Sequence, residues 1–153
     1  DNYIYILNVR FAGDIHFSKK VECDVENVRV PSMILQPVVE NAVNHGIRNI
    51  DWEGHIDLSV EKWNDHIEIS VRDNGLGMTG EQIQRVLSKK VHSSSGVGDS
   101  TGIGMNNVIS RLELYYERDG LMEIYSEGEG MGTEVVINIP LERSEKNVQN
   151  PDC

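Results

Sequence analysis

Apolar and polar positions recur along this chain with two different periods, one typical of strands and the other of helices. Strict alternation predicts strands over residues 14–24, 55–63, 66–74, 121–128 and 132–141. Helical spacing predicts helices over residues 31–47, 79–90 and 105–118, with Thr79 as the N-cap of the second. Because both kinds of element are interleaved in one chain, the pattern favours a layered α/β or α+β domain.

The helix predicted over residues 31–47 starts at Pro31 or Ser32, stops near Gly46 and has two unlike sides. The apolar side, expected to face a sheet, consists of Leu35, Val38, Val39 and Ala42. The other side carries Asn41, Asn44 and His45. Asparagine is a poorer helix former than the lysine and glutamate that usually cover a solvated face, so this side indicates an oxygen ligand or an amide hydrogen bond. A solvated face remains the alternative. Pro37 is expected to remove one backbone hydrogen bond and to bend this helix.

Three glycine-rich stretches interrupt the periodic pattern, at residues 73–78 (DNGLGM), 101–107 (TGIGMNN) and 128–134 (GEGMGTE). Glycine at the ends of strands and helices lets the backbone approach a ligand closely, and a helix that starts after Gly104 offers free N–H groups to phosphate. None of the stretches contains the Gly-Lys-Ser/Thr of a P-loop. Asp-Asn-Gly is also a strong turn signal, so Asp73 either binds a ligand or only closes a turn.

Length, charge and cysteine content exclude several classes of function. The chain has 153 residues, enough for one domain with a single core. Its formal charge of -11 provides no basic surface for nucleic acid, which we do not expect as a partner. Cys23 and Cys153 are too far apart in sequence to indicate a metal site or a disulfide framework, and they favour a reducing compartment. No signal peptide is visible, and no apolar run approaches the roughly 18 residues of a membrane span.

Four segments of the chain together resemble one known family of ATP-binding domains. ENAVNHG, DNGLGM, TGIGM and GMGTEVVINIP are similar to the N box, the two glycine boxes and the closing Gly-Thr strand of the GHKL (Bergerat) fold. DNA gyrase, a heat-shock chaperone, sensor histidine kinases and a mismatch-repair ATPase share this fold. LQPVVENAVNHG and GIGMNNVISRLELYY are most similar to sensor histidine kinases of the LytS/YesM type. The resemblance covers about residues 3–142 and implies an α+β, two-layer sandwich in which a mixed, mainly antiparallel sheet packs against three helices under a flexible ATP lid.

The resemblance implies the ATP-binding catalytic domain of a two-component sensor histidine kinase, which transfers the γ-phosphate of Mg·ATP to a histidine on an upstream dimerisation domain absent from this chain. ATP and Mg²⁺ are the implied cofactors. A response regulator and a second copy in the full-length homodimer are the implied partners, with the domain on the cytoplasmic side of a membrane-anchored bacterial sensor. The expected segments are the end of an upstream linker or dimerisation helix at 1–12, the catalytic domain at 13–143 with its lid at about 88–103, and a disordered tail at 144–153.

The family's binding residues have matches in this chain. By resemblance, Asn41 would hold Mg²⁺, Asp73 would accept a hydrogen bond from the adenine 6-amino group, and the Thr133 hydroxyl would support Asp73. Asn44 would contact phosphate, and His45 the base or ribose. The glycines would let base and phosphates approach the backbone, and two methionines would form an apolar wall. The full set of expected ATP-binding residues is Asn41, Asn44, His45, Asp73, Gly75, Gly77, Met78, Gly102, Ile103, Gly104, Met105 and Thr133.

At other positions the residue differs from the one that the family carries. Gyrase-type ATPases carry a glutamate base four residues before the metal asparagine, where this chain has Pro37. Glu40 lies about 100° around the helix from Asn41 and receives no base role. No catalytic residue is therefore assigned within this chain, which favours a phosphotransferase and predicts that the isolated chain does not phosphorylate itself. The alternatives are a GHKL ATPase or nucleotide switch, a serine kinase similar to anti-sigma factors, and a degenerate interaction module.

Four basic residues have no assigned role, three of them where the lid is expected to begin and one on the last predicted helix. Lys89 and Lys90, together with His92, either reach the γ-phosphate or form a solvated charge run. Arg111 either contacts phosphate or pairs with an acid such as Glu113.

Overall fold

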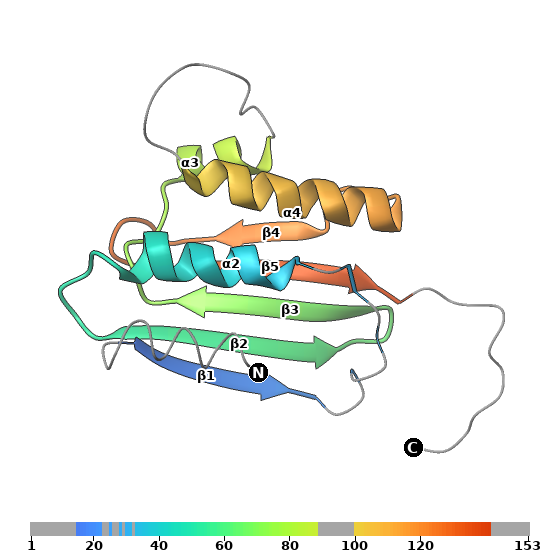
Figure 1. Cartoon of the computed structure of the whole chain (residues 1–153), viewed down its shortest axis with the longest axis horizontal. Coiled ribbons are helices and arrows are strands. Elements are labelled where there is room, and N and C mark those ends of the chain that lie inside the picture. The colour runs from blue at the N-terminus through green and yellow to red at the C-terminus, as the bar shows by residue number, and fades with distance from the viewer. Residues whose placement is uncertain are drawn as a thin grey trace, which may run out of the picture.

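A single mixed sheet forms the base of the computed structural model, which describes residues 15–22, 25, 28, 30–31, 33–88 and 100–141. The strands are β1 (Ile15–Val21), β2 (Gly54–Lys62), β3 (His66–Asp73), β4 (Met122–Tyr125) and β5 (Thr133–Pro140). They are ordered β1-β2-β3-β5-β4 across the sheet (Figure 1). β1 and β2 run parallel and every other neighbouring pair is antiparallel. This confirms the predicted mixed, mainly antiparallel sheet.

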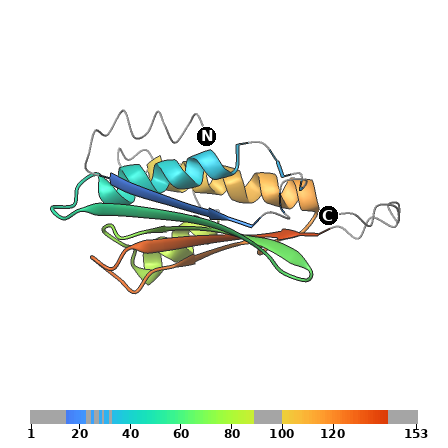
Figure 2. The same ribbon diagram turned by 90° about the horizontal axis from the view of Figure 1, so that it is seen from below.

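The helices form the second layer. They are α2 (Leu35–Asn41), which continues into the π-helical segment η2 (Ala42–Ile47), then α3 (Gly80–Leu87) and α4 (Ser100–Tyr116). α2 and α4 lie side by side on one face of the sheet, as the view along its edge shows (Figure 2). α3 packs against α4 and contacts β4. Its N-terminus is capped by Thr79, as predicted, in a reciprocal capping box with Gln82.

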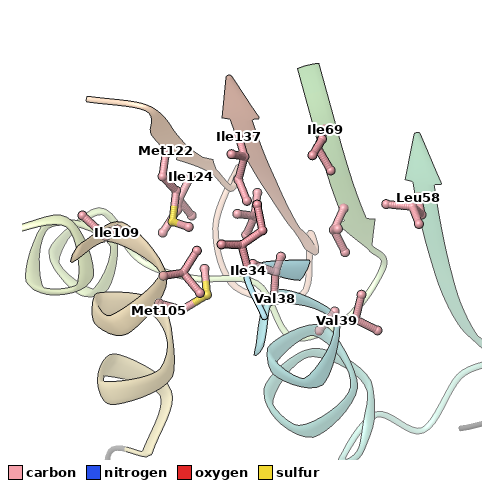
Figure 3. Close-up of a cluster of buried hydrophobic side chains, with 14 of the residues drawn as sticks. Ile34, Val38, Val39, Leu58, Ile69, Met105, Ile109, Met122, Ile124 and Ile137 are labelled. Carbon is pink, nitrogen blue, oxygen red and sulfur yellow. The ribbon is translucent and has the colours of Figure 1, made fainter. Parts of the chain in front are cut away.

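The core fills the space between the two layers. Val38 and Val39 of α2 and Met105 and Ile109 of α4 meet apolar side chains from the sheet, such as Ile137 (Figure 3). The predicted apolar side of the first helix is thus confirmed, although Leu35 is only partly buried. Among the described residues, no helix is long and apolar enough to span a bilayer.

The start of α2 corrects one expectation. Met33, with a left-handed φ of 66°, precedes the helix, which begins at Leu35 rather than at residue 31 or 32. Pro37 is therefore the third helical residue. A backbone N–H there has no partner within the helix, so the prediction that Pro37 removes a hydrogen bond is wrong.

Three predicted segments lie outside the described residues. They are the helix end at 1–12, residues 89–99 of the expected lid, and the tail at 144–153. Lys89, Lys90 and His92 fall in the second of them, and Cys23 and Cys153 are also outside the described part.

Candidate functional site

A cavity of about 200 Å³ lies between α2–η2 and α4. It is lined by Pro37, Glu40, Asn41, Asn44, His45, Gly104 and Met105. The polar side of the first helix and the second glycine box, about 60 residues apart in sequence, therefore line one cavity. This arrangement favours a ligand site over a merely solvated helix face.

The Asn41 side chain, which lines this cavity, has an oxygen without a hydrogen-bond partner. Its Oδ1 is fully buried and makes no hydrogen bond in the structure. A buried, unpaired amide oxygen destabilises a fold by about 1 to 3 kcal/mol and is rare without a functional reason. The atom is thus an unsatisfied acceptor in a side chain that lines the cavity.

A magnesium ion fits this oxygen. Mg²⁺ binds neutral and anionic oxygens, retains several waters and is commonly shared with substrate phosphates. Among the described residues, no group of three or more His, Cys, Asp or Glu side chains could hold a metal. A metal here would depend on Asn41, water and the ligand's own phosphates. Glu40, the neighbouring carboxylate, accepts a hydrogen bond from Gln36 Nε2 at 3.1 Å.

Asp73, a buried residue that is 6% exposed, ends β3. Burial raises its pKa to about 6, and backbone hydrogen bonds from Gly75 and Thr133 offset only part of that rise. The Gly75 N–H donates to Asp73 Oδ1 at 2.8 Å. At neutral pH the group is an ionised acceptor in a dry environment, suited to an amino group on a ligand.

Glycines surround Asp73 because the backbones there approach too closely for a side chain. A Cβ on Gly46 would lie 2.7 Å from Asp73 Oδ1, and one on Gly132 would lie 2.1 Å from the Asp73 carbonyl oxygen. A Cβ on Gly75 would lie 2.0 Å from the Gly46 carbonyl oxygen. The first glycine box is therefore in direct contact with η2, which carries Asn44 and His45 of the cavity. Asp73 and the cavity belong to one connected region.

The π-helical turn accounts for this contact. The Arg48 N–H donates to Val43 O at 2.9 Å, a π-type bond that skips one residue more than an α-helical bond. The Gly46 carbonyl instead accepts the N–H of Leu76 at 2.9 Å. Sequence analysis treated Gly46 only as a helix stop and missed this role. The signal available was a glycine placed directly after the polar residues Asn44 and His45.

Two further residues hold the first glycine box and were also missed. Asn74 Oδ1 accepts the His55 N–H at 2.7 Å, and its Nδ2 donates to Glu53 O at 2.9 Å. Ser126 Oγ accepts the Met78 N–H at 2.9 Å. Asn74 was interpreted only as a turn former, and Ser126 lies in a stretch with no distinctive pattern.

The second glycine box lies differently from the prediction. α4 begins at Ser100, not after Gly104, so Gly102 and Ile103 lie in its first turn. The N–H groups of the first three helical residues have no partner within a helix, so the free donors of α4 are those of residues 100–102 and include Gly102 but not Ile103. Gly104 has open space beside its Cα and lines the cavity.

Two other predicted residues lie apart from the cavity lining. Arg111 Nη1 donates to the carbonyl oxygen of Met33, at a long 3.4 Å, near the start of α2. Thr133 is buried and is the register partner of Asp73 in the β3–β5 ladder. The role of its hydroxyl stays a prediction.

Comparisons with known proteins show the family to which the chain is similar. Residues 30–143 match the family described as "Histidine kinase-, DNA gyrase B-, and HSP90-like ATPase". The chain is 31% identical over 150 residues to Sensor histidine kinase YpdA of Escherichia coli K12, covering 94% of this chain and 23% of that protein. It is 27% identical over 154 residues to Sensor protein LytS of Staphylococcus saprophyticus, covering 100% and 25%. The chain thus spans about a quarter of the length of these curated relatives.

Solved structures share the fold. The catalytic domain of histidine kinase ThkA superposes with a TM-score of 0.65 at 19% identity, covering 91% of this chain and 90% of that one. Mycobacterial sensor histidine kinase MprB gives 0.63 at 20% identity, covering 92% and 90%.

Proposed function

Because this chain belongs to the histidine kinase-, DNA gyrase B- and HSP90-like ATPase family and is the ATP-binding catalytic domain of a sensor histidine kinase, we propose that it binds Mg·ATP between α2–η2 and α4. The adenine lies at Asp73 and the metal at Asn41. The γ-phosphate passes to a histidine on another domain of the longer protein. The unpaired buried oxygen of Asn41, in a cavity that adjoins the buried Asp73 carboxylate, is the observation that supports this most directly.

Recognition of adenine follows from the charge of Asp73. An ionised carboxylate only accepts hydrogen bonds, so it favours the 6-amino group of adenine and opposes the 6-carbonyl group of guanine. Gly75 and Gly77 let the base lie close to the backbone. Met105, buried at the cavity, and the half-buried Met78 supply apolar contacts.

The phosphates and the metal occupy the cavity end of the site. Asn41 supplies an oxygen to Mg²⁺, Asn44 a donor to phosphate and His45 a contact to base or ribose. The first turn of α4 presents free N–H groups to the phosphates, among them that of Gly102, with Ile103 directly after it. When bound, the metal neutralises phosphate charge, and the residues of this chain position the nucleotide.

Transfer to another group is favoured over hydrolysis because the cavity offers no obvious base for water. Pro37 lines the cavity where related ATPases carry a glutamate, and the Glu40 carboxylate is engaged by Gln36. Glu40 nevertheless lines the cavity, which keeps hydrolysis as the second candidate. The histidine-bearing dimerisation domain, a response regulator and a second copy of the protein are the proposed partners, in a membrane-anchored sensor with this domain in the cytoplasm.

Calorimetry and phosphate labelling test the proposal. The chain should bind Mg·ATP more tightly than Mg·GTP, hydrolyse it barely above background and not label itself. Joined to a helical segment of the same protein that carries the acceptor histidine, it should transfer the γ-phosphate to that histidine, because linkage raises the effective concentration of the two sites. Equal affinity for the two nucleotides would contradict the adenine assignment. Rapid turnover by the chain alone would favour the ATPase alternative.

A further inference from the structure

One continuous series of hydrogen bonds joins the β4–β5 loop to Asp73. The Met78 N–H donates to Ser126 Oγ at 2.9 Å, and that hydroxyl donates to the Gly132 carbonyl at 2.7 Å. The Gly132 N–H donates to the Gly75 carbonyl at 3.0 Å. The Gly75 N–H then donates to Asp73 Oδ1 at 2.8 Å. These contacts tie the two loops to each other and to the carboxylate, and at the Ser126 hydroxyl the accepted bond strengthens the donated one.

Ser126 is the one side chain between the two loops in this series. Its hydroxyl accepts from one loop and donates within the other, a combination that an alanine or a valine cannot provide. A further contact to the Gly128 carbonyl is longer, at 3.4 Å, so the single hydroxyl proton is better placed on Gly132. Ser126 is half-buried.

The first glycine box, which Ser126 holds through the Met78 N–H, has a backbone conformation that requires glycine at residue 77. Gly77 adopts a φ of 73°, and a Cβ there would lie 2.1 Å from the Gly128 carbonyl oxygen. The Gly130 N–H also donates to the Leu76 carbonyl at 2.6 Å. The first glycine box is therefore seated on the β4–β5 loop along most of its length. Displacing that loop would move Gly77 and Met78 relative to Asp73.

We infer that Ser126 is a positioning residue for adenine recognition, which acts by holding Gly77 and Met78 against the β4–β5 loop and by orienting the N–H of Gly75 toward Asp73. This inference rests on the proposed function. It assigns no contact between Ser126 and the nucleotide. Loss of the hydroxyl therefore weakens the adenine end of the site and leaves the phosphate end, at Asn41 and α4, in place.

Calorimetric titration of the full chain with Mg·ATP and Mg·GTP tests the inference in four proteins: wild type, S126A, S126T and S70A. S126A should weaken Mg·ATP binding by about 3- to 10-fold, the range expected for one hydrogen bond, and should lower the ATP-to-GTP preference by a similar factor. S126T retains a hydroxyl and should behave like wild type. S70A is the matched control, because Ser70 is 6% exposed and donates one 2.7 Å hydrogen bond, to Glu134, away from the glycine box.

The outcomes distinguish a positioning role of Ser126 from a general loss of structure. If S126A does not unfold cooperatively, S126T and S126V repeat the comparison, since they have the same shape and differ only in the hydroxyl. Two results overturn the inference alone, provided that the wild-type chain prefers ATP. In the first, S126A weakens the binding of Mg·ATP and Mg·GTP equally. In the second, S126A binds Mg·ATP as tightly as wild type does. A wild-type chain without preference for ATP overturns the proposed function and the inference with it.

Discussion

Replacing Asp73 by asparagine should stabilise the folded chain while it weakens ATP binding. Burial raises the folded pKa of Asp73 from 3.8 to about 6. At about 1.4 kcal/mol for each pH unit, the ionised carboxylate reduces the free energy of unfolding by about 3 kcal/mol above pH 6. Asparagine has nearly the same shape, can still accept the Gly75 N–H and carries no charge. We expect D73N to gain about 1 to 3 kcal/mol in the free energy of unfolding.

The pH dependence of the stability gain tests whether the buried charge of Asp73 is its cause. Because the folded pKa lies above the unfolded one, the folded state binds more protons between about pH 4 and 6, and stability falls as pH rises through that range. The gain from D73N, measured by urea unfolding, should therefore be about half as large near pH 5 as near pH 8. D57N is the control, since Asp57 is exposed. A D73N variant that is less stable than wild type, or a gain that does not vary with pH, would refute this reasoning.

Two other substitutions test the cavity end of the site and the contact with η2. N41A should abolish the Mg²⁺ dependence of ATP affinity in calorimetry, whereas E40Q should leave it largely intact; a more damaging E40Q would assign an active role to Glu40. G46A places a Cβ 2.7 Å from Asp73 Oδ1 and should weaken Mg·ATP binding by at least about 10-fold. G80A, at a glycine whose Cβ position is open, is its control, and equal effects of G46A and G80A would contradict the steric argument.

The periodicity of the sequence was sufficient to predict the strands and most of the helices, while their arrangement in a mixed, mainly antiparallel sheet under the helices came from the family resemblance. Alternation located β2 and β3 to within one residue at each end, because their inward residues, such as Leu58 and Val71, are apolar and their outward ones polar. It failed at the starts of α2 and α4. α4 begins five residues before the predicted start, in a Ser- and Gly-rich stretch that favours a loop by local propensity. Packing against α2 and α3 offers a tertiary reason for helix in such a stretch.

The sequence was sufficient to predict which residues form the candidate site, but not the hydrogen bonds that join the segments carrying them. Asn41, Asn44 and His45 could be grouped because they share one side of a helix, and the structure places them in one cavity. No helical periodicity predicts a π-helical turn, so the bond from Leu76 to the Gly46 carbonyl could not be foreseen.

Burial of Asp73 is the common physical reason for the features that sequence analysis missed. A carboxylate in a dry pocket binds an amino group more strongly and discriminates against a carbonyl, but its ionised form destabilises the fold. Holding it there requires backbone N–H groups, which Gly75 and Thr133 provide. It also requires close approach of chain segments, which Gly46 and Gly132 allow because they have no side chain. The expected stability gain of D73N and its loss of ATP binding therefore have one cause, the buried charge of Asp73, and removing that charge produces both together.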